Sequence, residues 1–112
     1  MDYPVIVVPF LNVDGMAFYP FVLVKNQTLK QDALLIRHET IHLKQAAELF
    51  VIPFYLLYLF NYIINRFKYP DHYRAYYEII FEREAYQNEG RIDYLKTRKL
   101  WAWRHYFSNK AY

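Results

Sequence analysis

Hydrophobic residues near the start of the chain occur in two short runs that polar residues separate, a pattern typical of β-strands. Residues 3–11 are rich in β-branched and aromatic side chains, and residues 12–15 form a turn signal. Residues 16–25 have the same apolar character, with Pro20 marking a sheet edge or a bulge. We expect these two runs to pair as a β-hairpin, which must pack against helices because a lone hairpin is marginally stable.

Beyond this pair the spacing of apolar residues becomes helical. Asp32 is a suitable N-cap for a helix that continues to about Phe50. At 3.6 residues per turn, one face of this helix carries His38, Ile41, His42, Gln45 and Leu49.

Residues 49–64 form a run of sixteen residues without a charged side chain. A helix that spans a bilayer needs about 20 such residues, so the run is short for that purpose. Pro53 would kink this helix or begin a new one. The run therefore predicts either a buried central helix or a helix at a membrane interface, where Tyr55, Tyr58 and Tyr62 would suit the headgroup region.

Two further helices follow in the predicted order of elements. Asp71 can cap a helix over residues 72–89, which Gly90 would end, and a last helix is expected over residues 92–107. The sequence thus predicts one α+β domain over residues 1–112. It is predominantly helical, with an N-terminal β-hairpin and about four helices.

Composition narrows the chemistry that the chain can perform. It has no cysteine, so a disulfide or a thiolate metal site is excluded and any metal must be bound by His, Asp or Glu. Met1 is followed by no basic segment, so we expect no signal peptide and a cytoplasmic location, with the option of a peripheral position at the membrane.

The net charge of +3 is unevenly distributed, because six Lys or Arg residues follow position 90 against the single acid Asp93. Trp101, Trp103, Tyr106 and Phe107 are interleaved with these cations. The basic tail is either the solvated face of a helix or, together with residues 49–64, a membrane-surface contact. Nucleic acid is not an expected partner, because the cations are confined to one tail and no base-reading motif is present.

The segment His38-Glu39-Thr40-Ile41-His42 is an HExxH motif on the predicted helix. Residues i and i+4 share a helical face, so both imidazoles can reach one ion, and Glu39 can act as general base toward water at that ion. This spacing predicts a zinc site with His38 and His42 as ligands.

A catalytic zinc ion takes a third protein ligand, and the helix over residues 72–89 offers several carboxylates. Glu82 is the first choice, because Ala85, one turn later, is small enough to let this helix approach the HExxH helix closely. Glu78, Glu84 and Glu89 are the alternatives.

The HExxH motif together with Glu82-x-x-Ala85 resembles the gluzincin-type zinc metallopeptidases. It is similar to the Glu-x-x-Ala-Asp and Glu-x-x-Ala-Asn signatures of the integral-membrane CAAX-protease and heat-shock peptidase families and of the ImmA/IrrE-like peptidases. Small bacterial proteins with HExxH and FEREAY look similar as well. The resemblance implies a zincin-like core in which His38, His42 and Glu82 bind Zn²⁺, Glu39 is the catalytic base, and residues 16–25 align a peptide substrate.

Tyr86 occupies the position where those families have Asp or Asn, a residue that holds a histidine ligand in place. Its hydroxyl, Asp71 or Glu78 would have to perform this task here. We therefore predict a zinc-dependent metallopeptidase that hydrolyses peptide or protein substrates through a metal-activated water. The alternative is a catalytically inactive relative that serves as a binding or regulatory module. Such a module could also be associated with a membrane.

Overall fold

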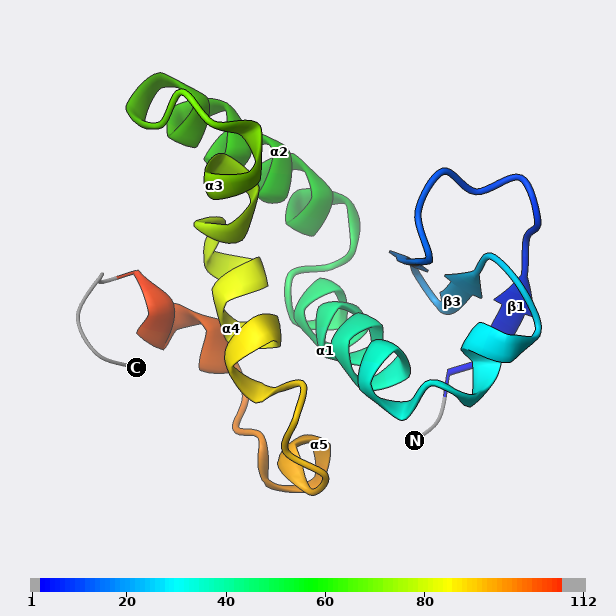
Figure 1. Cartoon of the computed structure of the whole chain (residues 1–112). Helices are drawn as coiled ribbons and strands as arrows, with labels where there is room; N and C mark the ends of the chain where they lie inside the picture. The colour runs from blue at the N-terminus through cyan, green and yellow to red at the C-terminus, as the bar shows by residue number, and fades with distance from the viewer. Residues whose placement is uncertain (1–2, 108–112) are drawn as a thin grey trace.

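A computed structural model describes residues 3–107, which combine a small sheet with a mostly helical chain (Figure 1). The sheet has three strands, β1 (Val5–Val7), β2 (Gly15–Phe18) and β3 (Phe21–Val24), in the order β1-β3-β2. The helices are α1 (Ala33–Glu48), α2 (Ile52–Lys68), α3 (His72–Tyr77), α4 (Ile80–Asn88) and α5 (Tyr94–Thr97), with two 3₁₀ turns, η1 (Thr28–Gln31) and η2 (Ala102–Tyr106). The prediction of a predominantly helical α+β fold is confirmed, with five α-helices within residues 3–107 where about four were expected.

The strand pairing differs from the predicted hairpin. The hairpin lies within the second apolar run, between β2 and β3, and Pro20 is in its turn. Strand β1 instead runs parallel to β3, with Val5 opposite Val22. The physical reason is burial: Val22 and Val24 are fully buried against Leu43 of α1, which places β3 at the centre of the sheet.

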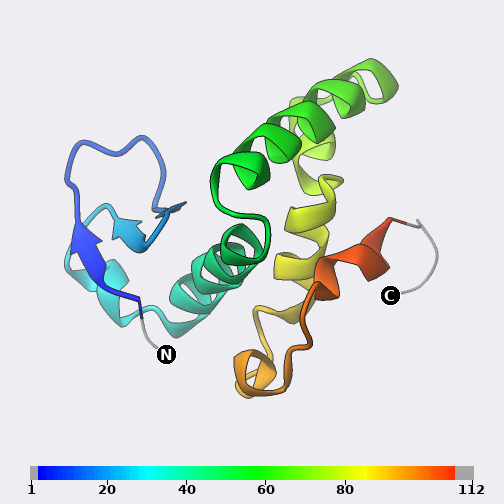
Figure 2. The same cartoon turned by 180° about the vertical axis from the view of Figure 1, so that it is seen from behind.

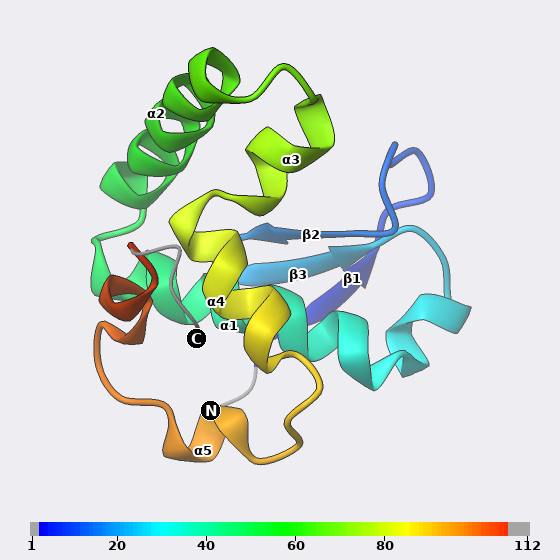
Figure 3. The same cartoon turned by 60° about the vertical axis from the view of Figure 1, so that its left-hand side comes forward.

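Helix α1 lies between the sheet and α4, as Figures 1 and 3 show from two sides. Its N-terminus is capped as predicted, since the Asp32 carboxylate accepts a hydrogen bond of 3.1 Å from the Leu35 amide. Leu43 packs against the sheet, and Ile41 packs against Ala85 of α4. The helix with the HExxH motif is therefore held on two sides.

The chain turns sharply between α1 and α2. Phe50 and Val51 have positive φ angles of 61° and 67°, a conformation that is rare for a β-branched residue and ends α1. Pro53 then stands in the first turn of α2, which confirms that it begins a new helix. Within the described residues no single helix is long and apolar enough to cross a membrane; only α1 and α2 taken together, bent by 113° at their junction, meet those criteria.

Helix α2 lies at the outside of the fold (Figure 2), so the prediction of a buried central helix over residues 49–64 is wrong. Only Phe54 and Asn65 of α2 are buried. A helix packed on one side buries only a stripe of its surface, and here the remaining surface is also apolar.

Two predicted helices are interrupted. The helix expected over residues 72–89 breaks between α3 and α4, where the Ile80 amide donates to Asn61 Oδ1 of α2 at 2.8 Å. The helix expected over residues 92–107 is divided into α5 and η2 by a segment in which Arg98 pairs with Glu48 and Glu84. Tertiary contacts have overridden helical continuity in both places. Lys110, the last cation of the basic tail, lies outside the described residues.

Candidate metal centre

Three side chains from two helices converge at one point between α1 and α4. The Nε2 atoms of His38 and His42 each lie 3.0 Å from the same atom, Oε1 of Glu82. One potential ligand atom from each of these three residues lies within 4.8 Å of the other two, and all three residues are buried. The group is therefore close enough to hold a metal ion.

The other ring nitrogen of each histidine is held by a hydrogen bond. Nδ1 of His38 lies 2.7 Å from Glu89 Oε1, and Nδ1 of His42 lies 2.8 Å from Gln45 Oε1. The amide nitrogen of Gln45 donates to the Phe81 carbonyl at 3.0 Å, so its oxygen must face His42. Each Nδ1 atom therefore donates a proton to an acceptor, and in the neutral imidazole the lone pair of Nε2 points toward Glu82.

This arrangement needs a positive charge at its centre. Two imidazole lone pairs and a carboxylate oxygen repel one another at 3.0 Å unless a proton or a metal ion lies between them. The Nε2 atom of His42 is buried and makes no well-aligned hydrogen bond with any residue in the range 3–107. An unsatisfied buried nitrogen of this kind is an expected property of a metal ligand.

The carboxylates named as alternatives to Glu82 have other partners. Glu78 pairs with Arg83. Glu84 is fully buried, accepts from Gln45 Nε2 at 2.9 Å and is paired with Arg98. Glu89 contacts His38 on the far side of the imidazole ring from Glu82. Of these four glutamates, Glu82 alone joins the converging group.

The residue that holds His38 was not identified from the sequence. Tyr86 packs the edge of its ring against His38, with ring centroids 4.4 Å apart, but its hydroxyl donates to Tyr76. Asp71 caps α3, accepting from the Tyr73 amide. Glu89 performs the task instead. Its position seven residues after Glu82, two helical turns later, was the signal for it.

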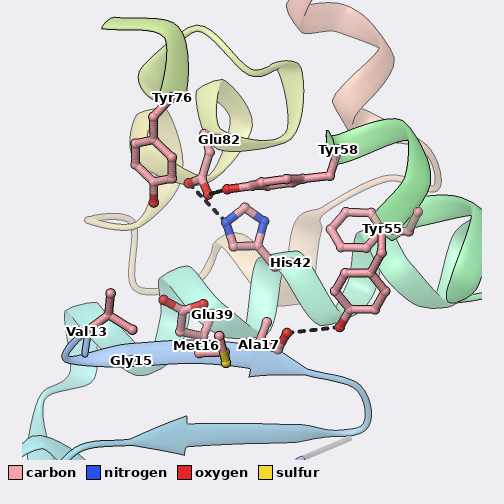
Figure 4. A pocket seen from close by; sticks show the side chains of 11 residues that line it. Val13, Gly15, Met16, Ala17, Glu39, His42, Tyr55, Tyr58, Tyr76 and Glu82 are labelled. Atoms are coloured by element: carbon pink, nitrogen blue, oxygen red, sulfur yellow. Dashed lines mark hydrogen bonds and ion pairs between the residues drawn. The ribbon is translucent and has the colours of Figure 1, made fainter. Parts of the chain in front are cut away.

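A cleft of about 270 Å³ opens beside the converging group (Figure 4). Glu39 of α1 and His42 and Glu82 line it on the side of the helices, and strand β2 lines it on the opposite side. The remaining lining residues are apolar or aromatic: Val13, Gly15, Met16, Ala17, Phe54, Tyr55, Tyr58 and Tyr76. The Glu39 carboxylate has no hydrogen-bond or ion-pair partner among the described residues, so it is available to a molecule in the cleft.

The charged groups of the site shift one another's pKa. Burial raises the pKa of Glu39 above its usual range, and the two histidines offset only part of this effect. Burial opposes the charged form of His42, but the charges of Glu82 and Glu39 and the contacts with Glu82 and Gln45 together outweigh it and raise the pKa of His42 to about 9. Burial alone would raise the pKa of Glu82, whereas the charge of His42 and the contact with His38 hold it well below its usual range. Without a metal, a proton on His42 supplies the positive charge.

Two tyrosines complete the surroundings of Glu82. The hydroxyl of Tyr58 donates to Glu82 Oε2, the carboxylate oxygen that does not contact the histidines. Burial, and then the charge of Glu82, raises the pKa of Tyr58 and of Tyr76 above the usual range, so both phenols stay protonated. Tyr58 thus orients the Glu82 carboxylate, while Tyr76 lines the cleft as a hydrogen-bond donor.

Strand β2 is an edge strand whose free edge faces the cleft. The Ala17 carbonyl points away from β3 and accepts a hydrogen bond of 2.9 Å from the Tyr55 hydroxyl. The amide and the carbonyl of one strand residue point to the same side, so the Ala17 amide also faces the cleft.

Searches with this sequence and structure found no matching protein-family model, no matching curated protein and no matching solved structure.

Proposed function

We propose that the protein is a zinc-dependent metallopeptidase. The observation that carries the proposal is the convergence of His38, His42 and Glu82 at one point. The Nε2 atoms of both histidines face this point, and the Nδ1 atom of each ring is already held by a hydrogen bond. Glu39 lies beside this group in a cleft that an edge strand bounds. A preorganised site of two histidines and one glutamate next to a free carboxylate is the composition of a catalytic zinc centre.

The donor set fits zinc in kind and in spacing. Ligand atoms about 2.0 Å from a tetrahedral ion lie about 3.3 Å apart. The separations of 3.0 Å between Glu82 Oε1 and the two Nε2 atoms differ little from that value. When bound, zinc supplies Lewis-acid chemistry: it lowers the pKa of water at the site and polarises a substrate carbonyl.

Glu39 supplies the proton transfer that amide hydrolysis requires. Its carboxylate takes a proton from the attacking water as the water oxygen bonds to the carbonyl carbon. The carboxylic acid so formed returns this proton to the amide nitrogen as the C–N bond breaks. The short distance along α1 from Glu39 to both histidines and the absence of a competing partner among the described residues support this role.

Strand β2 positions the substrate in this proposal. An extended peptide can pair with a free strand edge through main-chain hydrogen bonds, and the backbone of Ala17 faces the cleft that contains Glu39. The apolar lining from Val13, Met16 and Phe54 would then receive apolar side chains of the peptide. A sheet, an HExxH helix and a glutamate-donating helix in this spatial order would form a zincin-like core.

The test is the substitution Glu39→Gln in protein loaded with zinc. The variant should keep its fold and its zinc and should lose peptide hydrolysis by about 100-fold or more, since general-base catalysis contributes factors of that order. Glu78→Gln makes the same chemical change outside the cleft and should leave hydrolysis unchanged.

Two results would overturn the peptidase assignment. One is an equal rate of hydrolysis in the wild type and in Glu39→Gln. The other is a wild-type protein that binds zinc yet cleaves no member of a broad peptide library. The second result would leave a metal-binding protein without turnover, as in the alternative of a binding or regulatory module.

A further inference from the structure

The outward face of α2 is an apolar surface that the described chain leaves uncovered. Six side chains occupy it at helical spacing, from the first residue of α2 to its last turn: Ile52, Leu56, Leu59, Phe60, Ile63 and Phe67. All are exposed, Phe60 to 61% and Phe67 to 89%. We call these six residues the α2 face. It extends over about 22 Å at the rise of an α-helix.

The two asparagines of α2 lie on its opposite side, where they hold the helix in the fold. Asn65 donates to the Ala75 carbonyl at 3.0 Å, and Asn61 accepts from the Ile80 amide. Phe54 packs in the core with Ala46 and Ile79. This distribution reverses that of an ordinary surface helix, which turns its polar side chains outward. The orientation is fixed by inward contacts, so the exposure of the α2 face is a property of the fold.

The apolar surface continues beyond the helix itself. Phe50, in the turn before α2, is 85% exposed. Along the flank of α2 a groove of about 220 Å³ is lined by Leu57 and Ile64 of α2 and by Trp103 and Phe107 near η2. An apolar patch of this extent on a small protein marks an interaction surface.

Charge indicates what covers this surface. Residues 49–70 contain no Asp or Glu. The cations Arg66 and Lys68 are exposed in the last turn of α2, with Arg66 beside the face, and Arg74 stacks on the ring of Tyr69 beyond the end of the helix. The border of the α2 face is therefore positive or neutral, which complements a negatively charged partner.

A second copy of the chain fits this border poorly. Parallel pairing of two α2 faces would bring the cations Arg66 and Lys68 next to their counterparts. Antiparallel pairing would bring them to the positive end of the other helix dipole. Neither arrangement supplies an acid from α2 or its flanks.

We propose that the α2 face docks on an anionic phospholipid surface, with the helix axis lying along the membrane plane. The apolar side chains would enter the boundary between headgroups and acyl chains, while Arg66 and Lys68 would contact lipid phosphates. Tyr62, to one side of the α2 face, suits the headgroup level. This inference is independent of the metal site and of the proposed hydrolysis.

Co-sedimentation with lipid vesicles tests the proposal. The full chain is mixed with vesicles of phosphatidylcholine alone or of phosphatidylcholine with one third phosphatidylglycerol, at low and high salt. The double substitution Leu56→Gln/Phe60→Gln removes apolar area from the centre of the face. The control Phe10→Gln/Ile92→Gln changes two apolar side chains outside α2 that are even more exposed, 85% and 86%. Arg66→Gln/Lys68→Gln tests the charged border.

Wild type and control should bind the anionic vesicles, more weakly at high salt, and Leu56→Gln/Phe60→Gln should lower the partition coefficient about 10-fold or more. Arg66→Gln/Lys68→Gln should reduce it by a similar factor and weaken its salt dependence.

Circular dichroism and thermal unfolding establish that each variant is folded. Failure of the folded wild type to bind anionic vesicles would overturn the proposal. So would equal binding by the control and the Leu56→Gln/Phe60→Gln variant. If the wild type does not bind vesicles but forms a dimer in analytical ultracentrifugation, and Leu56→Gln/Phe60→Gln dissociates this dimer, the face is assigned to a second copy instead.

Discussion

Glu89 Oε1 lies 2.7 Å from Nδ1 of His38, while Glu82 Oε1 lies 3.0 Å from Nε2 of the same ring. One imidazole is thus held between a carboxylate within α4 and the carboxylate of the C-cap residue of the same helix. The Glu89 contact fixes the ring orientation and directs the Nε2 lone pair toward His42 and Glu82.

Removal of this contact should weaken metal binding without destroying the site. Glu89→Leu should lower zinc affinity by about 10- to 100-fold, the usual effect of losing a partner that orients a ligand. Competition titration against a zinc indicator measures the change, and Glu78→Leu is a matched control because Glu78 pairs with Arg83 away from the group. Equal affinity in wild type and Glu89→Leu would show that His38 needs no such support.

Zinc binding should release a proton below pH 9. The pKa of His42 in the metal-free protein is about 9, so at neutral pH its imidazole is protonated, whereas a metal ligand must be neutral. Apparent zinc affinity should therefore rise with pH up to about 9 and level off above it. Calorimetry in buffers of different ionisation enthalpy measures the released proton. Affinity that is independent of pH between 6 and 9 would contradict the His42–Glu82 pairing.

The same shift affects the stability of the metal-free protein. The pKa of His42 is raised from 6.5 in the unfolded chain to about 9 in the folded one. Its charged form therefore stabilises the fold fully below pH 6.5, and this contribution is lost as the pH rises through 9. Chemical unfolding of metal-free protein should show a free energy of unfolding that falls between pH 6.5 and 9. His42→Gln should remove this part of the pH dependence.

The close approach of α1 and α4 depends on Ala85, which is fully buried against Ile41. Ala85→Leu should separate the helices, move Glu82 away from the histidines, and cost about 1–3 kcal/mol of stability through overpacking. Zinc affinity should fall with it. Gln87→Leu adds the same side chain at an exposed position of α4 and should change neither quantity. Unaltered zinc affinity in Ala85→Leu would show that helix spacing does not set the site.

The backbone of β2 offers a test of substrate alignment. Ala17→Pro removes an amide that faces the cleft, at an edge position where proline is tolerated, and should lower kcat/KM about 5-fold while zinc is retained. Met16→Pro, one residue earlier, removes an amide directed at β3 and should lower Tm instead. Unchanged kcat/KM in a folded Ala17→Pro protein would argue against peptide pairing on this edge.

The grouping of His38, His42 and Glu82 could be predicted because it depends on helical spacing and on one small residue, Ala85, between two helices. The contact of Glu89 with His38 depends on the rotation of α4 about its axis, which follows from the interruption of the helix between α3 and α4 and from the hydrogen bond between Ile80 and Asn61. The spacing of seven residues places Glu89 on the same helical face as Glu82, but no local pattern encodes that rotation. The sequence therefore indicated the converging residues and not the residues that orient them.

The fold shows the same division between local and long-range information. Asp32 and Pro53 define helix starts by their own side chains, and both predictions are confirmed. The parallel pairing of β1 with β3 depends on which strand is buried most deeply against α1. The exposure of α2 could not be predicted because a run of Leu, Ile and Phe is equally compatible with a protein core and with a docking surface.

The central claim is that His38, His42 and Glu82 bind a zinc ion. The most direct measurement is the zinc content of purified protein, by elemental analysis after zinc loading at neutral pH and removal of free metal, in wild type and in His38→Ala. We expect one zinc ion per chain in the wild type and a large loss in His38→Ala, with the variant still folded by circular dichroism. A wild-type protein that holds no zinc after loading, or an equal zinc content in His38→Ala, would contradict the claim. The group would then be a buried cluster in which protonated His42 forms an ion pair with Glu82.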